Sequence, residues 1–198
     1  MSVCPHCSQR CEGQSPGQCE APQLRWTLKL GEAEPLARED LGGSRRTLGD
    51  SHPDTLTSIS NMAQLLQDQG KLGEAELLAL EALNGCRRTL GDAHPSTLAS
   101  ISNMATLLQT QGKLGEAEPL AREALDGRRR TLGDGPNTLN SISNFAVLLQ
   151  AQGKLGEAEP LAREALDGFR RALGASHPST RAVSAALASL LAAKRRKN

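Results

Sequence analysis

The chain has 198 residues, of which 38% are hydrophobic and only 2% aromatic. This composition argues against a large α/β enzyme or a β-sandwich, because strands draw on aromatic and β-branched residues. Lys and Arg number 23 against 22 acidic residues, which disfavours nucleic acid as a partner. The apolar runs are too short to cross a bilayer, and the first residues lack a secretory signal. We therefore expect a cytoplasmic protein without membrane insertion.

Four of the five cysteines stand near the N-terminus, at Cys4, Cys7, Cys11 and Cys19. A disulfide scaffold would spread its bridges over the whole fold, so we expect residues 1–29 to be a disordered, reduced tail. The Cys4–Cys7 spacing is that of thioredoxin-like dithiols, but the βαβ context of such sites is missing. The four thiols could also hold a zinc ion, although their spacing differs from that of paired zinc knuckles. No cofactor is expected, and a zinc-dependent regulator stays open as an alternative.

An internal repeat occupies most of the chain. The string Lys-Leu-Gly-Glu-Ala-Glu starts at residues 29, 71, 113 and 154, so the spacing is 42, 42 and 41 residues. Each unit is predicted to contain a first helix, a Gln-Gly-Lys turn and a second helix. The first helices are expected at 54–69, 96–111 and 137–152, and the second helices start at Leu72, Leu114 and Leu155. A His-Pro or Gly-Pro pair opens each first helix, where proline is tolerated.

The array is expected to span residues 30–193, as three complete helix pairs with a half-unit on either side. Residues 30–48 are predicted to be a lone second helix, in which Asp40 stands where later units have alanine. Residues 179–193 are predicted to be a lone first helix, before a basic tail at 194–198. A terminal helix needs a wettable outer face. The apolar run 182–187 lacks one, which suggests a longer array or self-association through this helix.

These residues resemble the tetratricopeptide repeat family. The motif positions of that family, which hold Trp, Leu, Gly, Tyr, Ala, Phe and Ala, fall on Ile59, Met62, Ala63, Leu66, Ala75, Ala79 and Ala82. The long period, the Arg-Arg-Thr-Leu-Gly-Asp-Ser-His-Pro connector and Gly-Glu-Ala-Glu-Pro-Leu are similar to the kinesin light chain and nephrocystin subtypes. The resemblance covers roughly residues 30–193. It implies an all-α, right-handed superhelical solenoid of antiparallel helix pairs that is not an enzyme and binds other proteins.

The three first helices differ at only five places, four of which share an arc of about 80° on a helical wheel. The second helices starting at Leu114 and Leu155 differ at only two places, so drift on wet surfaces does not explain the arc. An invariant Asn lies in the middle of the arc, and in the resembling family this residue hydrogen-bonds the backbone of a bound peptide. The hypothesis assigns backbone reading to Asn61, Asn103 and Asn144, and specificity to Thr57, Gln64, Asp68, Ala99, Thr106, Thr110, Asn140, Val147 and Ala151. The alternative is a solvated polar face that diversified after duplication.

The first helices contain no Lys or Arg, although related arrays use such side chains to grip carboxylates. We therefore predict a neutral, extended peptide segment that is recognised through its backbone. No phosphate loop and no Ser/His/Asp set occur, and the histidines before the prolines belong to the connectors. The predicted function is a non-enzymatic adaptor. The alternative is an interaction domain of a larger signalling ATPase or motor-cargo adaptor.

Overall fold

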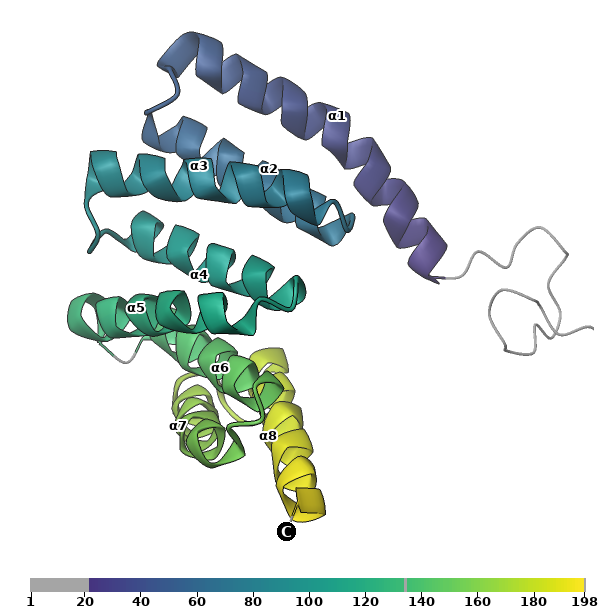
Figure 1. Ribbon diagram of the computed structural model, residues 1–198, viewed down its shortest axis with the longest axis vertical. Helices are drawn as coiled ribbons and strands as arrows, with labels where there is room; N and C mark the ends of the chain where they lie inside the picture. Colours follow the sequence, from purple (N-terminus) through teal and green to yellow (C-terminus); the bar gives the residue numbers. More distant parts are fainter. Residues whose placement is uncertain (1–21, 134, 198) are drawn as a thin grey trace, which may run out of the picture.

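The computed structural model describes residues 22–133 and 135–197, with only the backbone described for residues 22–30 and 197. These residues form eight α-helices and no strand, and consecutive helices pack against one another from α1 to α8 (Figure 1). The helices are α1 (Pro22–Leu48), α2 (Pro53–Asp68), α3 (Leu72–Leu90), α4 (Pro95–Thr110), α5 (Leu114–Leu132), α6 (Pro136–Ala151), α7 (Leu155–Leu173) and α8 (Pro178–Lys197). The all-α solenoid of helix pairs predicted from the sequence is confirmed. Helices α2, α4 and α6 are the first helices of the three complete units, and α3, α5 and α7 are the second helices.

The two end helices are longer than the sequence predicted. Helix α1 begins at Pro22, so residues 22–29 are helical and do not belong to a tail. Proline is well suited to the first position of a helix, and no Gly or Pro interrupts residues 23–30. As a result Pro35 lies in the interior of α1 and not near its start. Helix α8 continues through the basic residues to Lys197, since Lys and Arg are good helix formers and favour a helix C-terminus.

The connectors use the residues that the repeat marks out. In three of them the Nδ1 atom of a histidine accepts the backbone N–H two residues on, with distances of 3.2, 3.1 and 3.2 Å for His52, His94 and His177. Gly135 takes this place before α6 and makes no side-chain cap. The histidines are therefore N-caps of first helices, as the connector interpretation predicts.

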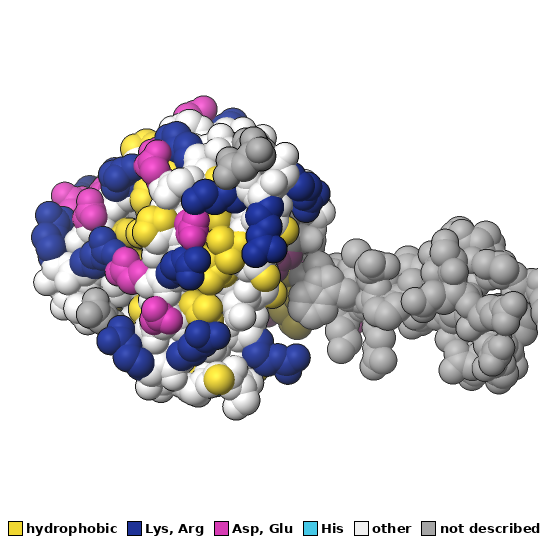
Figure 2. Space-filling view, turned by 90° about the horizontal axis from the view of Figure 1, so that it is seen from below, with side chains coloured by type: hydrophobic (Ala, Val, Ile, Leu, Met, Phe, Trp, Pro, Cys, Tyr) yellow, Lys and Arg dark blue, Asp and Glu magenta, His cyan; other side chains and the backbone are white. Residues whose placement is uncertain are grey.

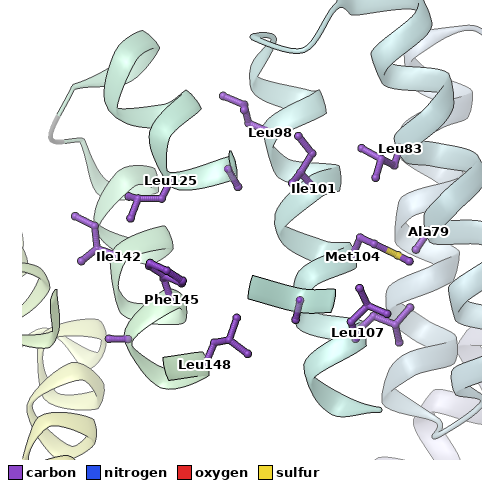
Figure 3. Close-up of a cluster of buried hydrophobic side chains, with 14 of the residues drawn as sticks. Ala79, Leu83, Leu98, Ile101, Met104, Leu107, Leu125, Ile142, Phe145 and Leu148 are labelled. Carbon is purple, nitrogen blue, oxygen red and sulfur yellow. The ribbon is translucent and has the colours of Figure 1, made fainter. Parts of the chain in front are cut away.

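Within each unit the two helices approach closely because the second helix presents small residues. Ala75 and Ala82 of α3 are 0% and 1% exposed. A Cβ atom on Gly85 would lie 2.3 Å from Cδ2 of Leu56 in α2, and Gly127 and Gly168 meet Leu98 and Leu139 in the same way. Leu, Ile, Met and Phe side chains fill the remaining space between neighbouring helices (Figure 3). Alanine and glycine at the helix crossing points let the two helices approach closely, so few large aromatic side chains are needed to fill the interface.

Neighbouring units are joined by a recurrent polar clamp on a glutamate of the second helix. Glu76 of α3 accepts from Nε2 of Gln111 at 2.8 Å and from Nζ of Lys113 at 3.0 Å, both in the turn of the next unit. The equivalent lysine pairs are Lys71–Glu34 at 2.7 Å and Lys154–Glu118 at 2.6 Å. Lys194 of α8, in the place of the turn glutamine, closes the last clamp on Glu159 at 2.6 Å. The Gln-Gly-Lys turn therefore holds units together as well as ending a helix.

A second ladder joins successive second helices. Each of its ion pairs links an arginine in one second helix to a glutamate in the next, as Arg45–Glu81 at 2.6 Å, Arg87–Glu123 at 2.7 Å and Arg129–Glu164 at 2.6 Å. The register of the ladder is the same at each step. It therefore fixes how one unit follows another.

We call the contact between the glycines of the second helices (Gly85, Gly127 and Gly168) and the leucines of the first helices the glycine seam. It provides a matched pair of variants. Gly127→Ala places a methyl group against buried Leu98, and the resulting overpacking of about 1–3 kcal/mol outweighs a gain in helix propensity of about 1 kcal/mol. Gly43 of α1 occupies the same position in its helix, but a Cβ atom there meets nothing within 4 Å. We expect Gly127→Ala to lower the free energy of unfolding in a denaturant titration, and Gly43→Ala to raise it. A rise for both variants would contradict the close approach.

The clamp predicts how stability depends on acid. Hydrogen bonds from Lys71 and Arg38 lower the pKa of Glu34 from 4.5 to about 2, and those from Lys154 and Gln152 do the same for Glu118. The folded pKa lies below the unfolded one, so this stabilisation is complete above about pH 4.5 and is lost as the pH falls towards about 2.

The variant Glu118→Gln removes one such carboxylate. We expect it to lower stability at pH 7 and to flatten the fall in stability between pH 5 and about pH 2, as measured by urea unfolding at each pH. The control is Glu116→Gln, because Glu116 is exposed and forms no ion pair among the described residues. Equal acid profiles for the two variants would show that the clamp carries no stability.

Candidate binding groove on the first helices

The exposed side chains of α2, α4 and α6 form one continuous surface, which we call the first-helix groove. Helix α2 contacts α4, and α4 contacts α6, so the first helices follow one another directly along the solenoid. The apolar stripe of each faces inward, with Ile59, Ile101 and Ile142 all 0% exposed. The variable core position is also buried, as Met62, Met104 and Phe145. The opposite, polar side of each helix is therefore turned to the groove.

Two equivalent hollows lie between successive first helices. The hollow between α2 and α4 is lined by Ser60, Ala63, Gln64, Gln67, Ala79, Ser100, Asn103 and Leu107. The hollow between α4 and α6 is lined by the matching residues one unit later, Ser102, Ala105, Thr106, Gln109, Ala121, Ser141, Asn144 and Leu148. In both, an alanine of the second helix is among the lining residues. Their volumes of about 10 and 20 Å³ suit a water molecule or one small group.

A wider, open depression adjoins the second of these hollows. Its volume is about 290 Å³, and it is lined by Thr106, Gln109, Thr110, Asn144 and Val147. Val147 is 40% exposed and contributes the apolar part of this surface. A depression of this size and openness accommodates a side chain or a short stretch of peptide lying along the helices.

The three asparagines of the hypothesis are exposed, but they are not equivalent in their surroundings. Asn103 lies against Ser60, Gln64 and Gln67 of the preceding first helix. Asn144 lies against the matching residues of α4. Asn61 belongs to α2, and the helix ahead of it is α1, which is of the second type. Each hollow needs two first helices, so Asn61 lines neither of them.

The asparagines of the groove differ in their hydrogen bonding from several polar neighbours. Gln64 donates to Asp68 at 3.0 Å, and Gln67 donates to Thr110 at 3.3 Å. The threonine hydroxyls donate to the backbone of their own helix, as Thr106 does to the carbonyl of Ser102 at 3.0 Å. Among the residues that the structure describes, the amides of Asn61, Asn103 and Asn144 have no hydrogen-bond partner. Each can therefore both donate to and accept from a bound group.

The groove carries almost no charge. Helices α2, α4 and α6 contain no Lys or Arg, and their acidic residues are Asp54 and Asp68. The basic residues of the three complete units lie on the second helices and in the turns, where some form the clamp and the ladder. Arg128 of α5 donates to the hydroxyl of Ser141, which lines the second hollow. A ligand with a free carboxylate would find no cation on the first helices.

The structure brings together about half of the predicted specificity residues. Gln64, Thr106, Thr110 and Val147 line the hollows or the depression. Others lie on the same helices without lining these spaces, namely Thr57, Asp68, Ala99, Asn140 and Ala151. The sequence comparison missed Ser60, Ser102, Gln67 and Gln109. They are identical from unit to unit and, unlike the asparagines, lie outside the arc of variable positions, so that pattern did not indicate them.

The described residues also bear on other kinds of site. Within the described residues, no group of three or more His, Cys, Asp or Glu side chains could hold a metal ion. Cys4, Cys7, Cys11 and Cys19 lie outside the described residues. Cys86 is a free, buried thiol. None of the helices in the described part of the chain is long and apolar enough to span a membrane.

The geometry defines a solenoid of helix pairs whose first helices share a polar groove. Two models of the tetratricopeptide repeat match the chain, one at residues 60–130 and the other at residues 25–54 and 138–179. The chain belongs to the tetratricopeptide repeat family and is of the kinesin light chain-like type.

Solved structures agree with this assignment. A Podosopora anserina protein with nearly identical TPR-like repeats, named as a kinesin light chain, is 28% identical. The match covers 87% of this chain and 83% of that one, with a TM-score of 0.72. BtubC (BKLC) from P. vanneervenii is 22% identical over 87% of this chain and 69% of that one, with a TM-score of 0.72, and shares the fold. No match was found among the curated proteins.

Proposed function

We propose that this protein is a non-enzymatic adaptor that binds an extended, neutral peptide segment of another protein in the first-helix groove. The observation that carries the proposal is the set of asparagine amides without a partner among the described residues, in a groove where Gln64, Gln67 and Thr106 are already bonded. A peptide backbone presents one N–H donor and one C=O acceptor per residue, which is the pattern that an asparagine amide complements.

The lack of cations argues for a neutral segment. Recognition of an acidic peptide or a terminal carboxylate needs Arg or Lys, and the first helices carry neither. The hollows have room for one small group each, the open depression has room for a side chain, and Val147 offers an apolar contact there. Binding through a few neutral hydrogen bonds and small contact areas gives modest affinity.

The same geometry fits an adaptor domain within a larger protein, such as a signalling ATPase or a motor-cargo adaptor. The similarity to kinesin light chain-like repeats supports a role in protein interaction for either form. A cytoplasmic location is part of the proposal, because the repeat array needs no disulfides and Cys86 is a free thiol.

The groove is tested by replacing all three asparagines. Peptides selected from a displayed random library against the unaltered protein serve as the probe, and fluorescence anisotropy gives their affinity. We expect Asn61→Ala, Asn103→Ala and Asn144→Ala together to weaken binding about tenfold or more, because each hydrogen bond contributes about 0.5–1.5 kcal/mol. Among the single variants, Asn103→Ala and Asn144→Ala should cost more than Asn61→Ala, since Asn61 lines neither hollow.

The matched control is Asn84→Ala, which removes an exposed asparagine from the second helix α3. It should leave both binding and the circular dichroism spectrum unchanged. Binding by the triple variant that equals binding by the unaltered protein would show that the polar face is only solvated.

The neutrality of the groove is tested separately through salt. Raising the ionic strength from about 0.1 M to about 1 M shortens the Debye length from about 10 Å to about 3 Å. We expect the affinity of the selected peptides to change less than about twofold over this range. A loss of tenfold or more would show that charged groups dominate recognition.

We further propose self-association through α8. Its residues Arg181, Ala185 and Ala188 are exposed, and no helix of the described chain covers this side of α8. This surface is separate from the first-helix groove.

A further inference from the structure

The helices at the two ends of the described array are halves of opposite type. Helix α1 is a second helix without a first helix packed ahead of it, and α8 is a first helix without a second helix packed after it. In the complete units, the missing partner would cover one face of each. These two faces carry residues that differ from the repeat.

On the open face of α1, the leucine that packs on the seam glycine in complete units is missing among the described residues. Gly43 corresponds to the glycines that receive a leucine in complete units, but nothing lies within 4 Å of its Cβ position. Leu36 is 68% exposed, whereas its counterpart Leu78 packs against the core. Asp40 occupies the place of Ala82, which is 1% exposed. The carboxylate of Asp40 accepts a hydrogen bond from Oγ of Ser58 in α2 at 2.8 Å. The face is therefore a small-residue groove with an exposed carboxylate at its edge towards α2.

The open face of α8 carries a basic residue, Arg181, at the position that would lie opposite Asp40 in a helix pair. Arg181 stands where the seam leucines Leu56, Leu98 and Leu139 stand in the complete units, and it is exposed. Ser184 takes the place of the buried isoleucines. Helix α8 contains basic residues and no acidic ones. Seen from the end where α7 and α8 lie, the surface shows hydrophobic side chains among Lys and Arg side chains, with several Asp and Glu side chains between them (Figure 2).

The ladder between second helices is also open at both ends. Arg170 of α7 corresponds to Arg45, Arg87 and Arg129, each of which binds a glutamate one unit later. Among the described residues, Arg170 has no such partner. Glu39 of α1 corresponds to Glu81, Glu123 and Glu164 and likewise has none. Within this part of the chain, Arg170, at the end formed by α7 and α8, therefore lacks an acidic partner. Glu39, at the end formed by α1, lacks a basic partner at the equivalent step of the ladder.

We propose that copies of this protein stack head to tail, with α1 of one copy packed on α8 of another as a complete helix pair. The stem of Arg181 then covers Gly43 of the next copy, and its guanidinium faces Asp40. Arg170 and Glu39 of the next copy add a further step to the ladder. The contact joins two different surfaces and does not close on itself, so it generates open chains. The inference rests on the self-association proposed for α8 and is independent of the peptide groove.

Simple capping of the two ends explains these residues less well. A cap needs only a polar outer face, and any polar residue would serve. Here Asp40 and Arg181 occupy the positions that would meet in a helix pair formed by α1 of one copy and α8 of another, and Glu39 and Arg170 occupy the corresponding positions of the ladder. Charge complementarity at matched levels is what a specific contact requires. The occupant that these faces fit is therefore a second copy of the chain.

The test is a charge exchange followed by sedimentation velocity of the full chain from about 1 μM to about 1 mM, the range of weak association. We expect the average mass of the unaltered protein to rise with concentration. Asp40→Arg alone and Arg181→Asp alone place like charges in the seam, and each should weaken association about tenfold or more. An equimolar mixture of the two single variants should associate again, as should the double variant, because opposite charges then face each other.

A protein that stays monomeric over the whole range overturns the proposal. Unchanged association of Asp40→Arg also overturns it and points to contact of α8 with itself, since Asp40 lies only on α1. Failure of the mixture to associate shows that the two residues do not meet. The selected peptides should bind all of these variants equally, which separates this test from that of the groove.

Discussion

The close approach of each second helix to its own first helix is the constraint on which the rest of the structure depends. Alanines at 0–6% exposure and a glycine that would clash if it carried a Cβ set the distance between the two helices. A protein with so few aromatic side chains cannot fill a wide interface, so it narrows the interface instead. Each unit is then a thin layer, and stability comes from contacts between neighbouring layers.

Polar contacts between layers supply the register that small apolar residues cannot. The glutamate clamp ties the turn of one unit to the second helix before it, and the arginine ladder links second helices. Both use the charged residues of the repeat on the outer side and in the turns. The first helices are thereby left without basic side chains, and the groove can offer neutral donors and acceptors. Under the proposed function, recognition uses the first helices, whereas these polar contacts between layers use the second helices and the turns.

The two end helices depart from the repeat at the residues that join neighbouring layers. Where a helix lacks its pair among the described residues, the residues of the seam change from Ala and Leu to Asp40 and Arg181, and Glu39 and Arg170 have no ladder partner within that part of the chain. An array whose layers recognise only their neighbours has no intrinsic stop, since its last layer offers the surface that the next would use. End residues therefore decide whether the array terminates or continues into another copy.

The sequence by itself determined the helix pairs, because hydrophobic periodicity, proline starts and glycine turns are local signals that recur in each unit. It also placed the three asparagines on one polar face. Only the tertiary structure decided which of them face a preceding first helix, and so why Asn61 differs from Asn103 and Asn144. Invariant groove residues such as Gln67 and Gln109 gave no signal, because they lie outside the arc of variable positions that marked the asparagines. The clamp on Glu76 and the open seam at Gly43 were equally hidden, since both join residues that are far apart in sequence and meet only when layers stack.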